Sequence, residues 1–306
     1  MAAGRSPFAD TEFVWGPPRS PLCWVDVDTL GSRRGGFERL DMPGRYLTTE
    51  EPDPLGARPD YRPMRPSWAV IGEESRKGGL PILFRRFIAL EPTEDAILGF
   101  AQRCGMLTSG TLIHRSVSSD VGEVRLAEPL ALWRAEIVAM RSMVEVWDAV
   151  QESKPERLLQ LVKMKNRRRP EGTSYWVSYK ESRRLYTVLR PARVGIARSN
   201  IGWRALFLVQ KVVNERLTDH TAPLLSTTAD HTPLRKGKGD RLRMDVSPLN
   251  LLGALWLQFA RGIEGDREYR CCAACGEWLE IAPGSYTKRV RFCRPVCRVN
   301  FHRRKR

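Results

Sequence analysis

The chain of 306 residues lacks any apolar run that approaches the roughly 18 residues needed for a membrane-spanning helix. Its first residues, Met-Ala-Ala-Gly-Arg-Ser-Pro-Phe, also lack the hydrophobic core of a secretory signal peptide. The hydrophobic content of 42% nevertheless favours a folded protein. Together these features predict a cytoplasmic protein without membrane contact.

The chain also lacks the motifs of common catalytic and nucleotide-binding sites. No Gly-x-Ser-x-Gly, phosphate-binding loop or dinucleotide fingerprint occurs, and none of the four histidines stands in a His-Glu-x-x-His setting. His220 and His231 lie near Asp219 and Asp230, which suggests a second metal site, but these residue types are also common in turns. We therefore predict a protein that is not an enzyme and has no catalytic residues.

Cysteine is sparse, and the seven cysteines show no pattern of a disulfide framework, which favours a reducing compartment. Four of them form two close pairs near the C-terminus, Cys-x-x-Cys-Gly and Cys-x-x-x-Cys, with 17 residues between the pairs. Zn²⁺ prefers four thiolate or imidazole ligands in a tetrahedron. The spacing predicts a zinc site at Cys272, Cys275, Cys293 and Cys297, the alternative being two accidental pairs.

Cys271 leaves a second choice for the first ligand, because it also pairs with Cys275, with three residues between. Gly276 follows directly after Cys275, and glycine there can take the positive φ that a tight metal knuckle needs. This arrangement favours Cys272 as the ligand. Cys271 then remains a spare thiol or a competing ligand.

The segment between the two pairs has the pattern of a short hairpin. Residues 277–281 alternate polar and apolar side chains, a Pro-Gly-Ser turn follows, and residues 287–292 can return as the partner strand. Cys293 and Cys297 are four residues apart, as on one face of a helix that runs from about Pro295 to about Arg304. The pattern predicts a treble-clef-like zinc ribbon.

Acidic residues are absent from position 284 to the end, a segment rich in arginine. Residues 270–306 hold ten basic and two acidic side chains, and so carry half of the formal net charge of +16. Such a patch favours binding of nucleic acid phosphates, DNA in preference to RNA, although solvated basic tails and an arginine-rich composition are alternatives. The candidate nucleic-acid-binding residues are Lys288, Arg289, Arg291, Arg294, Arg298, Arg303, Arg304 and Lys305.

A family resemblance rests on the knuckle, the hairpin and the Arg-Phe-Cys-x-x-x-Cys-Arg run with its basic tail. This pattern resembles the C-terminal zinc ribbons of bacterial CGNR-type zinc-finger proteins, which join the ribbon to an ABATE-like N-terminal domain. The resemblance implies a transcriptional regulator. The chain departs from the family where Arg-Val-Asn, rather than Gly-Asn-Arg, follows the last cysteine. The resemblance covers about forty residues.

The remaining pattern predicts an α+β fold with a mainly helical domain and short strands. We expect an irregular segment rich in Pro, Gly and Arg over residues 1–80, a main domain over 81–264 and the zinc ribbon over 265–306. Within the first segment, residues 22–27 and 67–71 are candidate strands. The main domain is the candidate sensor of a small-molecule ligand or a partner.

A helix is predicted at 94–104, after the capping Thr93. Further helices are predicted at 129–151, 155–165, 203–217 and 249–263. A strand is predicted at 81–89 and a hairpin at 222–246. The helix at 129–151 carries an apolar stripe that favours core packing over a homodimer seam. It comprises Leu130, Trp133, Ile137, Met140, Val144 and Trp147. A second basic cluster, residues 163–169, precedes the aromatic run 175–179, which suits either nucleic-acid binding or a solvated helix end followed by a buried strand.

Overall fold

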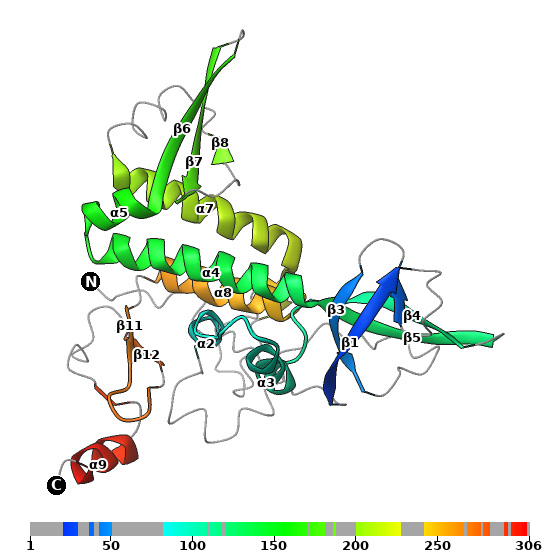
Figure 1. Cartoon of the computed structure of the whole chain (residues 1–306). Coiled ribbons are helices and arrows are strands. Elements are labelled where there is room, and N and C mark those ends of the chain that lie inside the picture. The colour runs from blue at the N-terminus through cyan, green and yellow to red at the C-terminus, as the bar shows by residue number, and fades with distance from the viewer. Residues whose placement is uncertain are drawn as a thin grey trace. The chain divides into compact units, whose positions relative to one another are not determined.

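The chain is a mixture of helices and strands in the computed structural model (Figure 1). The structure describes residues 21–29, 37–39, 43–50, 82–108, 110–117, 120–169, 172–180, 186–187, 200–227, 242–265, 268–276, 278–281, 291–292 and 295–304. The chain divides into two compact units. Unit 1 comprises residues 1–134 and 219–306, and unit 2 comprises residues 135–218. The candidate strand at 67–71 lies outside the described residues.

A small closed barrel of five strands forms one part of unit 1. Its order is β1-β2-β4-β5-β3, with β1 parallel to β2 and every other pair antiparallel. Val27, Tyr46 and Ala127 are buried at its centre. Three of its strands come from the segment that the sequence suggests is irregular. The strands are β1 (Leu22–Thr29), β2 (Phe37–Arg39), β3 (Gly44–Thr49), β4 (Thr111–Val117) and β5 (Asp120–Pro129).

Residues 83–88 form a helix, α2 (Leu83–Ile88), so the predicted strand at 81–89 is wrong. A short apolar run does not distinguish a buried strand from a buried helix. Phe84 and Phe87, three residues apart, are both fully buried, and α2 contacts α8 (Leu251–Glu264). The helix α3 (Glu94–Cys104) is confirmed, with Thr93 accepting the N-cap hydrogen bond from the Ala96 amide at 3.4 Å.

A buried carboxylate joins the barrel to the helices of unit 1. Glu128, in β5, is fully buried and accepts hydrogen bonds from the Leu107 amide (2.9 Å), the Thr108 hydroxyl (2.6 Å) and the Trp133 indole (3.0 Å). Burial raises the pKa of Glu128, and these hydrogen bonds offset the shift only in part. The carbonyl of Leu107 in turn accepts from the Leu252 amide of α8 at 2.8 Å. The loop after α3 is thus held from both sides.

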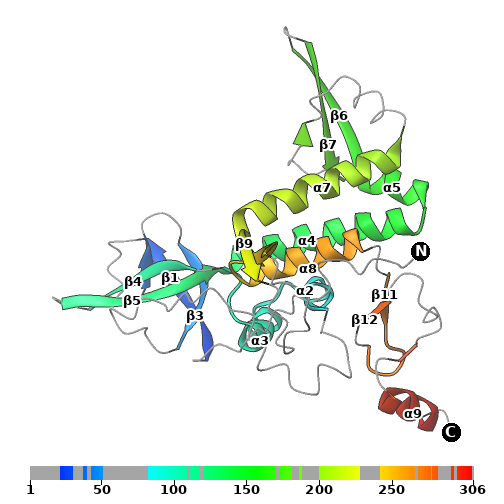
Figure 2. The same cartoon turned by 180° about the vertical axis from the view of Figure 1, so that it is seen from behind.

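The hairpin before α8 is confirmed by β9 (Thr221–Thr227) and β10 (Leu242–Pro248), which pair antiparallel, and Figure 2 shows β9 beside α8. His220 has a structural place here: its ring Nδ1 lies 3.1 Å from the Asn250 amide nitrogen, and its carbonyl accepts from the Leu249 amide at 2.9 Å. A side chain at Gly253 would collide with that carbonyl. His231 and Asp230, the other half of the second candidate metal site, lie outside the described residues.

Unit 2 is built from long helices and a β-hairpin. The predicted helix at 155–165 ends early, because β6 begins at Val162, and the basic cluster at 163–169 is therefore a strand. The six stripe residues of α4 are all buried, which confirms that they belong to the core. The elements are α4 (Leu130–Gln151), which begins in unit 1, α5 (Pro155–Leu161), β6 (Val162–Arg169), β7 (Gly172–Tyr179), β8 (Tyr186–Thr187) and α7 (Ile201–His220).

Among the helices described, none combines the length and the apolar character that crossing a bilayer requires.

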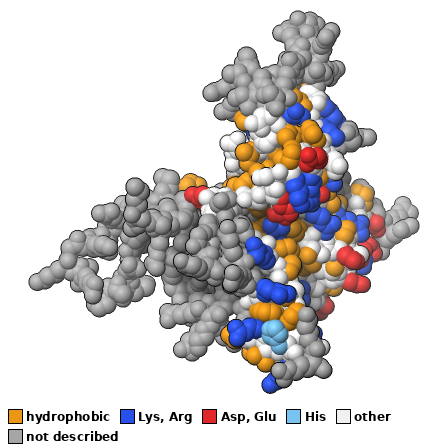
Figure 3. Space-filling view, turned by 90° about the vertical axis from the view of Figure 1, so that its left-hand side faces the viewer, with side chains coloured by type: hydrophobic (Ala, Val, Ile, Leu, Met, Phe, Trp, Pro, Cys, Tyr) orange, Lys and Arg blue, Asp and Glu red, His pale blue; other side chains and the backbone are white. Residues whose placement is uncertain are grey.

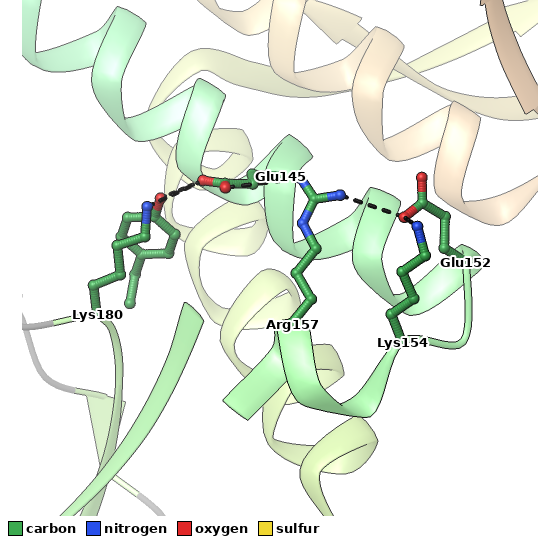
Figure 4. Close-up of polar contacts among 6 residues, drawn as sticks. Glu145, Glu152, Lys154, Arg157 and Lys180 are labelled. Atoms are coloured by element: carbon green, nitrogen blue, oxygen red, sulfur yellow. Dashed lines mark hydrogen bonds and ion pairs between the residues drawn. The ribbon is translucent and has the colours of Figure 1, made fainter. Parts of the chain in front are cut away.

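Glu145 of α4 links three elements of unit 2 (Figure 4). Its carboxylate accepts a hydrogen bond of 2.5 Å from the Tyr179 hydroxyl of β7 and lies 3.4 Å from the Lys180 ammonium and 3.8 Å from the Arg157 guanidinium of α5. Burial acts to raise the pKa of Glu145, but the Tyr179 hydrogen bond and the two cations outweigh it. The pKa therefore lies below its usual value of 4.5.

This lowered pKa makes the contribution of Glu145 to stability depend on pH. A carboxyl with a lowered folded-state pKa stabilises the fold above its unfolded-state pKa and loses that contribution as the pH falls through the folded-state pKa. We expect Glu145→Gln to lower the free energy of unfolding by about 1–2 kcal/mol at neutral pH. The difference from the parent protein should shrink once the pH falls below 4.5. Urea unfolding across this pH range measures it.

Glu156→Gln is the matched control, because Glu156 is an exposed carboxylate on α5 in the same unit. A loss of stability as large in the control, or a loss in Glu145→Gln that does not change with pH, would contradict this role for Glu145.

Candidate metal centre and basic helix

The C-terminal hairpin is formed by the strands on either side of the knuckle. β11 (Glu268–Cys271) pairs antiparallel with β12 (Trp278–Ile281), with Cys271 opposite Trp278. The predicted strand at 277–281 is confirmed as β12 over residues 278–281, but its partner in the structure precedes the knuckle. Of the expected partner strand at 287–292, Arg291 and Phe292 are in neither helix nor strand, and residues 287–290 lie outside the described residues.

The knuckle is a tight turn that closes the hairpin. The Gly276 amide donates to the Cys272 carbonyl at 2.9 Å, which places Cys272 and Cys275 on one turn. Gly276 has φ +76°, the left-handed conformation that glycine adopts without strain. The positive φ expected from the sequence is therefore present. It turns the chain so that two cysteine side chains can converge on one point.

The predicted C-terminal helix is confirmed as α9 (Pro295–Arg303), with Cys297 in its first turn. No described residue of α9 is buried. The helix meets the preceding segment through aromatic contacts: the rings of Phe292 and Phe301 lie 5.2 Å apart, and the Arg291 guanidinium lies 5.8 Å from the Phe301 ring. A helix of nine residues with no buried side chain is marginally stable by itself in water.

Three thiols from the knuckle and from α9 come together. The sulfur atoms of Cys272, Cys275 and Cys297 all lie within 4.8 Å of one another. Four ligands at a metal–sulfur distance of about 2.3 Å in a tetrahedron place neighbouring sulfurs about 3.8 Å apart, so the three thiols fit around one ion after a small adjustment. These residues could therefore hold a metal ion. Cys293, the fourth predicted ligand, lies outside the described residues.

Cys271 is not a member of this thiol group. It ends β11, where it is exposed, whereas Cys272 is buried. Partial burial raises the pKa of the Cys271 thiol, and the nearby Arg85 offsets this only in part. Between the two neighbouring cysteines, the geometry favours Cys272, as the knuckle argument predicts.

The main chain ties the knuckle to the segment that leads toward α9. The Ala273 amide donates to the Arg291 carbonyl at 2.8 Å. This bond brings together two segments that are 18 residues apart in sequence. It therefore places the chain just before Cys293 beside the other cysteines.

Arg85 of α2 anchors the hairpin to unit 1, a contact that the sequence analysis does not identify. Its guanidinium carbon lies 5.2 Å from the Tyr269 ring and 4.9 Å from the Trp278 ring, and the residue is only 5% exposed. Tyr269 also packs edge-on against Phe84 at 5.2 Å, and its hydroxyl occupies the space beside Gly262 of α8. A guanidinium stacked against aromatic rings stabilises such a junction through cation–π attraction. Arg85 is far in sequence from Tyr269 and Trp278, so the spacing of residues along the chain does not predict this contact.

The candidate nucleic-acid-binding residues are placed in part. Arg291 lies beside the knuckle, and Arg298, Arg303 and Arg304 lie on or directly after α9. All four are exposed. In Figure 3, basic and apolar side chains are interspersed at the lower end of the view, where α9 lies. The other four, Lys288, Arg289, Arg294 and Lys305, lie outside the described residues.

In comparisons with known proteins, no family model, no curated protein and no solved structure matches this chain. The resemblance to CGNR-type zinc ribbons therefore stays a prediction from the motif itself.

The thiol cluster predicts a sharp difference between two adjacent cysteines. We expect Cys272→Ser to lose the bound metal, because a serine hydroxyl is a poor replacement for a thiolate ligand. Cys271→Ser should keep one metal ion per chain. Elemental analysis of the two purified proteins measures this. Retention of the metal in Cys272→Ser together with its loss in Cys271→Ser would show that the other cysteine is the ligand.

Proposed function

We propose that the C-terminal segment is a zinc finger that binds nucleic acid, duplex DNA in preference to RNA, and that the chain is a transcriptional regulator. The observation that carries the proposal is the convergence of three thiols with an exposed, arginine-rich helix. The barrel of unit 1 and the helices of unit 2 would then sense a ligand or a partner.

Zinc is the metal that best suits the donors. Thiolates are soft ligands, and Zn²⁺ takes four of them in closed structural sites. Cys293 is the proposed fourth ligand, since it lies two residues after Arg291, whose carbonyl is bonded to the knuckle. Two residues of extended chain span about 7 Å, which is enough for Cys293 to reach the other thiols. Four thiolates close the coordination sphere, so the role proposed for the metal is structural.

The kind and number of charges on α9 support nucleic acid as its binding partner. The described residues of α9 include no acidic side chain, and a guanidinium binds phosphate in a bidentate manner. A helix of nine residues is about 14 Å long. The major groove of B-form DNA, about 12 Å wide, admits such a helix, whereas the major groove of duplex RNA is too narrow. These contacts would be to phosphates, which give affinity with little sequence preference.

A second candidate function is favoured by two apolar side chains on α9. Val296 and Val299 are 64% and 47% exposed and are three residues apart on the helix. An exposed apolar pair beside basic residues also suits a protein partner. In that case the zinc only stabilises the C-terminus, and the helix is a protein-interaction module.

The salt dependence of DNA binding separates the two functions. If each arginine neutralises about one phosphate, the combined variant Arg298→Gln, Arg303→Gln and Arg304→Gln should flatten the slope of log K against log salt by about 2 to 3 units. The variant should keep its metal, because none of these residues is a thiol ligand. Fluorescence anisotropy with a mixed-sequence DNA duplex measures the slope.

The matched control replaces three exposed arginines of unit 1 by glutamine. They belong to α2, α3 and α4 rather than to α9, and are Arg86, Arg103 and Arg134. The control removes the same charge and should change the slope much less. If the parent protein shows no salt-sensitive binding to DNA or RNA at low ionic strength, the regulator proposal fails and the interaction-module function takes its place.

A further inference from the structure

The hairpin β6–β7 of unit 2 is strongly basic. Its two strands, residues 162–169 and 172–179, contain five basic residues and no acidic one. The basic residues all lie in β6, at positions 163, 165, 167, 168 and 169. Neither the metal centre nor α9 accounts for this concentration of charge in a different unit of the chain.

The register of the hairpin places most of these residues on one face. The eight residues of β6 pair without a break with those of β7, from Val162 opposite Tyr179 to Arg169 opposite Gly172. Alternate positions of a strand share a face and lie about 6.6 Å apart. Positions 163, 165, 167 and 169 therefore form one row of four basic residues. The Lys163 ammonium donates to the Leu159 carbonyl at 2.9 Å, at the base of the hairpin. The candidate contacts are the three positions nearer the far end, 165, 167 and 169.

The opposite face of the hairpin is committed to the core at its base. Val162 and Val177 are 1% and 0% exposed, and they belong to the row that alternates with the basic one. The basic face is buried only at the base, where Ser178, the register partner of Lys163, is 0% exposed. One step further along, Lys165 and its register partner Trp176 are half-buried. The base of the hairpin thus fixes it to its unit, and the basic row continues beyond that base.

The base of the hairpin is held firmly, and its far end extends beyond the helices of its unit. Tyr179 and Lys180 bind Glu145 of α4 at 2.5 and 3.4 Å. Figures 1 and 2 show the two strands projecting away from α5 and α7. A two-stranded ribbon supported at one end can enter a groove without moving the rest of its unit.

We propose that the β6–β7 hairpin is a second nucleic-acid-binding site, which takes the major groove of duplex DNA. That groove admits a two-stranded ribbon, and the basic row from position 165 to position 169 would contact the phosphates along its edge. Duplex RNA is a poor substitute because its major groove is deep and narrow. The site needs no metal, so it is independent of the C-terminal zinc finger.

Protection of a strand edge is the simpler explanation of the charges. β6 is one of the two edge strands of the sheet β6-β7-β8, and charged residues on an edge strand prevent pairing with other chains. One or two lysines are enough for that purpose, and they need not share a face. Three successive arginines at the end of β6 are more than protection of the strand edge requires.

The test uses the full-length protein with its metal bound and compares two triple variants of equal charge. The first is Lys165→Gln, Arg167→Gln and Arg169→Gln. The control is Arg141→Gln, Lys154→Gln and Lys211→Gln, at exposed positions in the same unit. With duplex DNA we expect the first variant to flatten the slope of log K against log salt by about 2 to 3 units and the control to leave it nearly unchanged. The same difference should appear in a Cys272→Ser background.

A second measurement uses the unmodified sequence and does not depend on how the variants fold. Acetylation of lysines, followed by mass spectrometry, should show Lys165 protected by duplex DNA, with Lys154 and Lys211 still reactive. The proposal is overturned if Lys165 is not protected, if both triple variants lose binding equally, or if duplex RNA protects Lys165 as well as duplex DNA does.

Discussion

The convergence of thiols from the knuckle and from α9 is the constraint on which the C-terminal segment depends. Cys272 and Cys275 come from one turn and Cys297 from the first turn of α9, and their sulfur atoms lie within 4.8 Å of one another. No described residue of α9 is buried, so apolar burial does not hold this helix. A helix of nine residues is also too short to be stable alone in water. A metal ion that binds all three thiols would supply the missing free energy of folding.

The hairpin that carries the knuckle is in turn fixed to the body of unit 1. Arg85 stacks against Tyr269 and Trp278, which lie on β11 and β12, and α2 contacts α8. The strands on either side of the knuckle are thus connected to α2 through aromatic rings and a guanidinium. Loss of the metal should release α9 first, because β11 and β12 keep these contacts.

Local signals predict local features of this chain well. Thr93 before an acidic first turn predicted α3, the stripe on α4 predicted its buried face, and the cysteine spacing with Gly276 predicted the knuckle and three of its thiols in one place. Features that depend on distant pairing were not predictable in this way. The barrel brings together strands from residues 22–49 and 111–129, and β12 pairs with the strand before the knuckle. The short apolar run of α2 gave the wrong element because its length suits a strand as well as a helix.

Hydrogen–deuterium exchange with and without metal tests the central claim most directly, because it follows α9 and the rest of unit 1 in one experiment. With metal bound, the amides of residues 295–303 should be protected. After removal of the metal by a chelator they should exchange at the rate of an unfolded chain, while the amides of α8 (Leu251–Glu264) keep their protection. Equal protection of α9 in both states would contradict the claim that the metal holds this helix.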